Sequence, residues 1–328
     1  MIFSHCGLAK FFFVFSRLPM KKVSDIKNQL AQKSCFGSLK GIVFGCLAGI
    51  CYGINPLGVL PLYAEGLSPE TVLCYRFAFG AMLLGATIVA CRKSFKVKLR
   101  DFWILGALGL LFFMSSLSFY ASFKYMDAGL ASTLLFIYPL EVTLMMCLFF
   151  KEKLTLKTVL SISISFFGMG LLYHGGGEGG SNINGFGFLL VFIASITNAT
   201  PIVLLHQAKL KVGALKSSFY IVVFCFVFMF LYATLLGSGV PSIPATPSQW
   251  GWGLMLGFVP TFVSLVFMAK AVKLVGSTPT AITGALEPLT AVCVGVFVFG
   301  ETMTLRLAVG ITLILMSVVL IAIRRAPK

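Results

Sequence analysis

Two glutamates lie inside long apolar stretches of the chain. Glu141 occurs in the segment YPLEV and Glu287 in ALEPLT, whereas the other acids lie at the ends of apolar stretches or between them. A charge at the centre of a membrane helix costs about 2.5–3.5 kcal/mol, so such residues usually serve function. Tyr138 and Thr290 each lie three residues from one of the glutamates, on the same helix face. We therefore expect these four side chains to line a polar cavity; the alternative is a protonated glutamate hydrogen-bonded inside the bundle.

Arg76 also lies inside an apolar stretch, about five residues from its start, which is roughly 8 Å deep at 1.5 Å per residue. Its side chain could extend back to the outer interface, or face the cavity and pair with an acid or an anionic substrate. Other polar residues in apolar helices are candidates for substrate contact or for hydrogen bonds between helices: Tyr52, Asn55, Tyr120, Thr197 and Asn198. Four prolines are expected to break helices, because proline lacks an N–H and clashes with the preceding turn: Pro56, Pro139, Pro201 and Pro288.

The residue patterns of common enzyme and metal sites do not occur in the sequence. The histidines lack metal-ligand spacing, and there is neither a GxxxxGK[ST] stretch for nucleotide phosphates nor a GxSxG stretch for a nucleophilic serine. We expect no catalytic residues, no metal and no cofactor. The alternative that gives Glu141 and Glu287 a chemical role is a polytopic membrane enzyme that uses them as acid and base on a lipid-linked substrate.

The composition identifies the solvent in which these residues must be placed. Of 328 residues, 58% are hydrophobic and 11% charged, and the mean hydropathy is +0.98. Soluble domains carry about 45–50% apolar and about 25% charged residues, so a soluble fold could not cover its surface. The net charge of +16 is not arranged as a nucleic-acid-binding face. The chain is expected to lie in a lipid bilayer.

Ten apolar segments are long enough to cross the hydrocarbon core, which takes about 20 residues. They are residues 41–62, 71–91, 102–123, 128–150, 156–173, 185–206, 217–237, 250–269, 277–299 and 304–323. Of the 26 Lys and Arg residues, all but Arg76, Lys124 and Arg306 then fall on one side. The positive-inside rule therefore predicts a multi-pass protein of the cell membrane with both termini in the cytoplasm.

The chain contains an internal repeat. At an offset of 149 residues, Pro139 aligns with Pro288 and Glu152 aligns with Glu301, without a gap; at an offset of 145, Pro56 aligns with Pro201. Each copy contains five spans, and an odd number inverts the second copy, as in many secondary transporters. The expected fold is an all-α polytopic membrane protein of ten transmembrane helices, arranged as two inverted five-helix repeats.

The expected organisation follows from these boundaries. It comprises a cytoplasmic N-terminal segment (1–40), a first repeat (41–173), an external linker (174–184), a second repeat (185–323) and a cytoplasmic tail (324–328). The apolar run within residues 1–19 is too short to cross a membrane. We interpret this segment as an upstream extension of the reading frame or as an interfacial segment.

Several motifs resemble those of the EamA-type transporters of the drug/metabolite transporter superfamily. The first span contains Gly53, Asn55 and Pro56, and Arg76 follows a Ser-Pro pair at 68–69. The fourth helix of each half carries a central proline and ends in Glu-x-x-Thr, at Glu152 and Glu301. The motifs occur in order in both halves, over about residues 40–323.

The resemblance implies a secondary transporter, of the exporting type, for a small organic metabolite such as an amino acid or for toxic compounds. It implies alternating access around a central cavity that both repeats line. Proton antiport through Glu141 or Glu287 and facilitated exchange are both compatible with the sequence. The expected partners are a small-molecule substrate, the lipid bilayer and, for antiport, the proton; nucleic acid is not expected.

Overall fold

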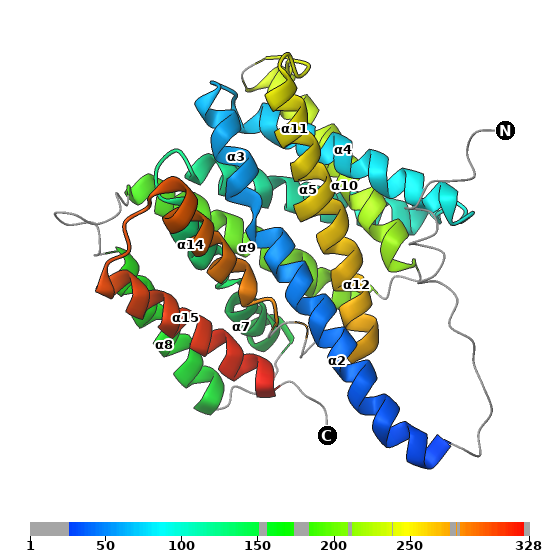
Figure 1. Ribbon diagram of the computed structural model, residues 1–328, viewed down its shortest axis with the longest axis vertical. Coiled ribbons are helices and arrows are strands. Elements are labelled where there is room, and N and C mark those ends of the chain that lie inside the picture. Colours follow the sequence, from blue (N-terminus) through cyan, green and yellow to red (C-terminus); the bar gives the residue numbers. More distant parts are fainter. Residues whose placement is uncertain are drawn as a thin grey trace.

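The computed structural model of the chain is built from helices, and contains no strand among the residues that it describes (Figure 1). These are residues 26–150, 156–173, 184–208, 212–237, 239–275, 280 and 283–324. The predicted N-terminal segment before residue 26, nearly all of the linker 174–184 and the tail after Arg324 lie outside them. Seven helical stretches are long and apolar enough to cross a membrane, by length and composition: residues 39–64, 69–90, 99–122, 128–149, 185–204, 214–235 and 247–275.

The described residues of the first half of the chain form seven helices. They are α2 (Ile26–Gly53), α3 (Asn55–Ala64), α4 (Pro69–Ala90), α5 (Leu99–Ser122), α6 (Ala128–Leu135), α7 (Tyr138–Phe150) and α8 (Leu156–Tyr173). Helices α2 and α3 are separated at Ile54, just before Pro56, and α6 and α7 are separated at residues 136–137, just before Pro139. Each interruption falls where the missing N–H of proline ends the preceding hydrogen-bond pattern.

The second half forms α9 (Gly185–Ala208), α10 (Ala214–Leu235), α11 (Pro247–Leu256), the π-helix η2 (Gly257–Val263), α12 (Ser264–Val275), α14 (Leu286–Phe299) and α15 (Leu305–Arg324). A turn at residues 284–285 precedes α14 and its Pro288. Helices α11, η2 and α12 form one continuous rod in which the π-helical turn surrounds Pro260. Sequence reasoning did not anticipate this turn.

The prediction that Pro201 breaks a helix is wrong. It lies inside α9, which continues from Gly185 to Ala208. In the turn just before it, the hydroxyl of Thr200 donates to the carbonyl of Ile196 over 2.8 Å. A membrane helix can retain a proline without breaking, and α9 is such a case.

The other three predicted spans coincide with α8, α14 and α15. Their apolar stretches among the described residues are shorter, at residues 159–168, 286–299 and 308–317. The structure therefore shows a multi-pass, all-helical membrane protein with seven clear spans.

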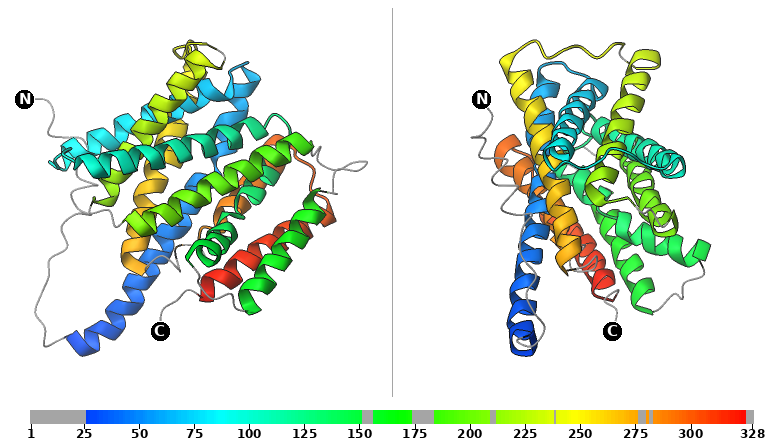
Figure 2. Two further views of the ribbon diagram at one scale, coloured as in Figure 1. Left: turned by 180° about the vertical axis from the view of Figure 1, so that it is seen from behind. Right: turned by 90° about the vertical axis from the view of Figure 1, so that its right-hand side faces the viewer.

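The two halves pack against each other by an alternating pairing of helices. Helix α2 runs beside α12, α9 beside α5, and α4 beside α10. Helix α8 lies beside α15 at one edge of the bundle (Figures 1 and 2). Helix α14 packs on α2 and α6, and α7 packs on α9. Residues distant in sequence are thus brought together at the junction of the halves, where α2, α4, α5, η2 and α14 meet.

Candidate functional site

Arg76 of α4 is at the centre of this junction and is only 1% exposed. Its Nε donates a hydrogen bond to the hydroxyl of Thr261 in η2 over 3.0 Å, and its Nη1 donates to the hydroxyl of Tyr120 in α5 over 2.8 Å. Its guanidinium carbon lies 5.3 Å from the ring centre of Tyr52 and 5.4 Å from that of Tyr120. The arginine therefore does not extend to an interface but is held inside the bundle.

The hydrogen bonds continue from Tyr120 to the break between α2 and α3. The Tyr120 hydroxyl donates to Oδ1 of Asn55 over 2.9 Å, and Nδ2 of Asn55 donates to the carbonyl of Tyr52 over 2.8 Å. That carbonyl lies four residues before Pro56, which has no N–H to offer it. The proline thus leaves an acceptor that fixes the Asn55 amide, and Asn55 in turn fixes Tyr120.

Thr261 is held by the same device in the second half. Pro260 has no N–H for the carbonyl of Leu256, four residues earlier, and the Thr261 hydroxyl donates to this carbonyl over 3.0 Å. With its proton used there, the hydroxyl oxygen accepts from Arg76. We define the Arg76 cluster as Tyr52, Asn55, Arg76, Tyr120 and Thr261; four of these were predicted as candidates, and Thr261 was missed. Its signal was a polar residue adjacent to a proline in an apolar run, as for Asn55.

The acid with which Arg76 interacts electrostatically is Glu287, near the start of α14. Glu287 also interacts with Tyr52 and Tyr138, so these groups share one neighbourhood. Among the described residues, no carboxylate forms a hydrogen bond or an ion pair with Arg76. A buried guanidinium without a paired anion is strongly disfavoured. These residues are therefore suited to bind an anion beside Arg76.

Helix α2 approaches α14 at van der Waals distance beside this acid. A Cβ at Gly53 would overlap the carbonyl oxygen of Glu287 and lie 2.7 Å from the Cβ of Thr290. The hydroxyl of Thr290 donates to the carbonyl of Leu286 over 2.7 Å. The predicted residues Glu287 and Thr290 therefore lie against the end of α2, with Thr290 hydrogen-bonded within its own helix.

Glu141 has different surroundings. Its Oε2 accepts a 2.6 Å hydrogen bond from the hydroxyl of Ser195 in α9, while its Oε1 is buried without a hydrogen-bond partner. The hydroxyl of the predicted residue Thr197 donates to the carbonyls of Ile193 and Ala194 in its own helix. Asn198 is half-buried on the same helix and has no hydrogen bond from its side chain to the described residues. The sequence prediction joined all these residues in one cavity, whereas the structure places Glu141 with Ser195.

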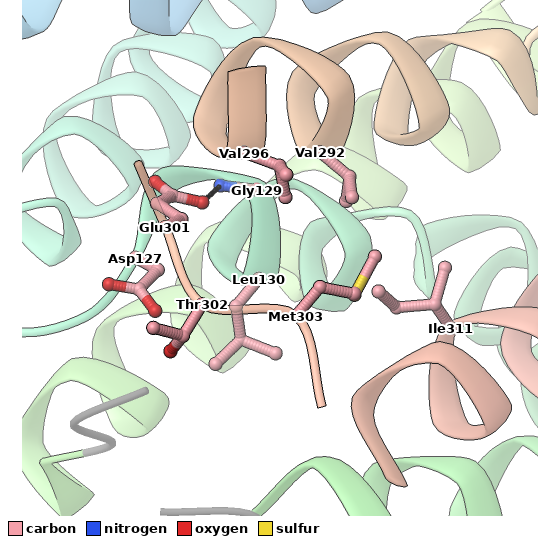
Figure 3. A pocket seen from close by; sticks show the side chains of 9 residues that line it. All are labelled: Asp127, Gly129, Leu130, Val292, Val296, Glu301, Thr302, Met303 and Ile311. Atoms are coloured by element: carbon pink, nitrogen blue, oxygen red, sulfur yellow. Dashed lines mark hydrogen bonds between the residues drawn. The ribbon is translucent and has the colours of Figure 1, made fainter. Parts of the chain in front are cut away.

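Glu301 connects the two halves at the start of α6. Its carboxylate accepts hydrogen bonds from the N–H groups of the first two residues of α6, Ala128 (2.8 Å) and Gly129 (3.2 Å). Figure 3 shows the bond to Gly129. Burial raises the pKa of Glu301, and Asp127 raises it further, while the two N–H groups oppose the shift. The carboxylate caps a helix from the opposite half of the chain, which is a structural contact. Its repeat counterpart Glu152 lies outside the described residues.

Comparison with known proteins identifies the family. The sequence model of the EamA-like transporter family matches residues 39–174 and, separately, residues 185–323. The chain belongs to the EamA-like transporter family. The resemblance drawn from the motifs is thereby confirmed, and the protein is a membrane protein of a transporter family.

Named relatives of this EamA-like protein are themselves described only as transporters. An uncharacterized transporter of Archaeoglobus fulgidus is 26% identical over 266 residues, covering 80% of this chain and 91% of that one. The uncharacterized transporter YdfC of Bacillus subtilis is 25% identical over 250 residues, covering 75% and 79%. A protein of known crystal structure shares the fold with a TM-score of 0.61 at 18% identity, over 88% of this chain and 99% of that one.

Proposed function

We propose that the protein is a secondary transporter that moves a small organic solute bearing a carboxylate, such as an amino acid, outward by alternating access. The observation that carries the proposal is the burial of Arg76 without a paired anion among the described residues. Arg76 uses Nε and one Nη1 hydrogen for Thr261 and Tyr120. Guanidinium has five N–H donors in a plane that suits a carboxylate, so donors remain for a substrate.

The neighbourhood of Arg76 suits an amino acid in particular. Glu287 places a carboxyl group within electrostatic range of Arg76, in the neighbourhood of Tyr52 and Tyr138. A solute with a carboxylate and an ammonium group could bind Arg76 through the carboxylate and Glu287 through the ammonium group. Aromatic rings also interact favourably with an ammonium group, and the two tyrosines provide them.

Ten spans in two inverted five-helix repeats fit this function, because both halves must contribute to one central site. The helix pairing supports the repeat: exchanging α2 with α9 and α12 with α5 converts the α2–α12 pair into the α9–α5 pair. The α4–α10 and α8–α15 pairs are converted into themselves. The separate matches of one family model to residues 39–174 and 185–323 support it as well. In this proposal α8, α14 and α15 complete the ten spans.

Substrate class is tested by the thermal stability of the purified protein with three matched compounds: an amino acid, its N-acetyl derivative and its amide. The two compounds with a free carboxylate should stabilise the protein, by about 2.7 kcal/mol at 100 times the dissociation constant, whereas the amide should not. Arg76→Gln should abolish the effect, and Arg100→Gln, a change at an exposed cation, should retain it. Equal stabilisation by the amide would contradict the role of Arg76.

Topology is tested by reporter fusions along the chain. Fusions after residues 66, 126, 180, 243 and 302 should report the outside, and fusions after residues 95, 154, 212 and 274 the cytoplasm. A single reversed site in the second half would contradict the inverted repeat, because the halves would then share one orientation.

A further inference from the structure

The carboxyl group of Glu141 is hydrogen-bonded on one side only. Its Oε2 accepts from Ser195, which is 1% exposed, and its Oε1 is buried without a partner. An ionised carboxylate is acceptor-only and binds several donors, whereas a protonated carboxyl carries a donor of its own. The single donor supplied by Ser195 leaves the ionised form under-solvated, so this geometry favours the neutral acid.

Among the described residues, no charged side chain of the packed elements compensates Glu141. Helix α7 packs on α9 and, more weakly, on α15. Described residues of α9 include no charged side chain, and His206, near its end, is its one further titratable residue. On α15 the charged residues are Arg306 and Arg324, at its two ends. On α7 itself the titratable neighbours are Tyr138 and Cys147. A proton is therefore the cation available to neutralise this carboxylate within the described part of the bundle.

Ser195 is one of the lining residues of a small, mainly apolar pocket between α6 and α9. The pocket is lined by Leu134, Ile137, Phe188, Val191, Phe192 and Ser195. Leu134 lies near the end of α6, and Ile137 belongs to the interruption between α6 and α7, so the pocket adjoins this interruption. Ser195 thus connects the pocket lining with the Glu141 carboxyl through one hydrogen bond.

The second half lacks an equivalent acid. At the offset of 149 residues the counterpart of Glu141 is Thr290, whose hydroxyl donates to Leu286 of its own helix. The Glu141–Ser195 pair is thus a feature of one half only and is separate from the Arg76 cluster. Helix packing alone does not require an acid at position 141, because the equivalent position of the other half is occupied by Thr290.

We infer that Glu141, with Ser195, is the proton-binding site of the transporter. The inference rests on the proposed function. In one orientation a proton from water forms an O–H bond at Oε1 of Glu141, and in the other orientation this bond breaks and the proton returns to water on the opposite side. Ser195 keeps its hydrogen bond to Oε2 and orients the carboxyl throughout. The proton then binds at Glu141 and the solute binds at Arg76. In this inference, movement at the helix interruptions couples the two sites.

Infrared difference spectroscopy of the purified protein tests proton binding without any solute. The wild type should show the C=O stretching band of a protonated carboxylic acid, which disappears as the pH is raised. Of the bands of protonated carboxylic acids, one should be lost in Glu141→Gln, displaced in frequency in Ser195→Ala, and retained in Thr197→Val. A Glu141→Gln spectrum with the same carboxylic-acid bands as the wild type at every pH tested would overturn the inference.

Proteoliposomes that contain a trapped pH-sensitive dye test coupling. With an equimolar mixture of the common amino acids as the probe, the wild type should move protons in the direction opposite to the movement of the amino acids. Glu141→Gln should reduce proton movement to the level of empty liposomes, yet still exchange labelled amino acids across the membrane. Exchange without proton movement in the wild type, or exchange driven by a sodium gradient instead, would overturn the inference alone. Absence of any exchange in the wild type would count against the proposed function, while the infrared result would still decide proton binding.

Discussion

Glu287 and Glu141 stand beside repeat-equivalent prolines, but their surroundings differ. Glu287 immediately precedes Pro288 and shares its neighbourhood with Arg76, Tyr52 and Tyr138. Glu141 lies two residues after Pro139 and has one hydrogen-bonding neighbour, Ser195. The two acids differ by three positions within the repeat; one carboxyl group lies at the junction of the halves, and the other contacts α9.

This difference shows how a duplicated helix can acquire two roles. The interruption before each proline is retained in both halves, at residues 136–137 and 284–285. The polar residues beside it are not retained: Tyr138 and Glu141 of one half correspond to Glu287 and Thr290 of the other. The backbone break is thus common to both repeats, while the proposed solute and proton sites are specific to one each.

The largest effect is expected from Arg76→Gln. Truncating one partner of a buried, hydrogen-bonded charge costs about 2–5 kcal/mol, so amino-acid exchange in proteoliposomes should fall at least about 30-fold. Arg76→Lys should not restore it, because an ammonium group lacks the planar fork that reaches Thr261 and Tyr120 together. If Arg76→Gln exchanged amino acids at the wild-type rate, Arg76 would not be the solute-binding group. The contrast between Glu287, which lies near Arg76, and Glu141 would then have no functional meaning.

Gly53→Ala should disturb the contact between α2 and α14 next to Glu287. The added methyl group meets the carbonyl of Glu287 and the Cβ of Thr290, and overpacking of this kind costs about 1–3 kcal/mol. Thermal unfolding in detergent should show a lower midpoint for this variant. Gly251→Ala is the matched control, because a Cβ at Gly251 meets nothing within 4 Å. Equal midpoints for the two variants would contradict the close approach of α2 and α14.

Tyr120→Phe should have an intermediate effect. It removes the hydroxyl between Arg76 and Asn55, and a hydrogen bond to a charged group contributes about 1.5–3 kcal/mol. Affinity for carboxylate compounds, measured by their thermal stabilisation of the protein, should fall by about tenfold or more. Tyr232→Phe should leave affinity unchanged, since the Tyr232 hydroxyl forms no hydrogen bond with the described residues.

Thr197→Val should have the smallest effect. The Thr197 hydroxyl is bonded to carbonyls of its own helix, so its loss should change the free energy of unfolding by no more than about 0.5 kcal/mol. Exchange and proton movement should both be retained. A loss of either in Thr197→Val, two residues from Ser195, would extend the site along α9 and weaken the assignment of the Glu141–Ser195 pair.

Much of the helical layout could be predicted from the sequence, because apolar length and the positions of prolines are local properties. Four polar residues of the Arg76 cluster could be recognised individually, because a polar residue within an apolar run is also a local property of the sequence. Which of them meet depends on how helices distant in sequence pair, and no local pattern encodes that. The contacts of Glu141 with Ser195 and of Arg76 with Thr261 were therefore missed, while the single cavity expected for Glu141 and Glu287 stays a prediction.

Pro201 illustrates the same limit at the level of the backbone. A proline breaks a membrane helix or is tolerated in it according to the groups that surround it. Pro56 coincides with a break whose freed carbonyl is taken by Asn55. Pro201 is accommodated in a continuous α9, with the Thr200 hydroxyl bonded in the preceding turn. The residue type is the same, and the outcome is decided by its neighbours.

The isolated positive charge of Arg76 has a consequence for the response of the protein to voltage. One elementary charge that crosses the full membrane field does work of about 2.3 kcal/mol per 100 mV. In the proposed alternating-access cycle, the guanidinium of the empty site would change its position within that field. A bound solute of net negative charge would cancel the charge of Arg76, so the loaded form would reorient with less electrical work than the empty one, whereas a zwitterionic amino acid would leave the net charge unchanged. For an anionic solute, membrane potential would then act mainly on the return of the empty transporter, and would favour exchange of one solute for another over net movement.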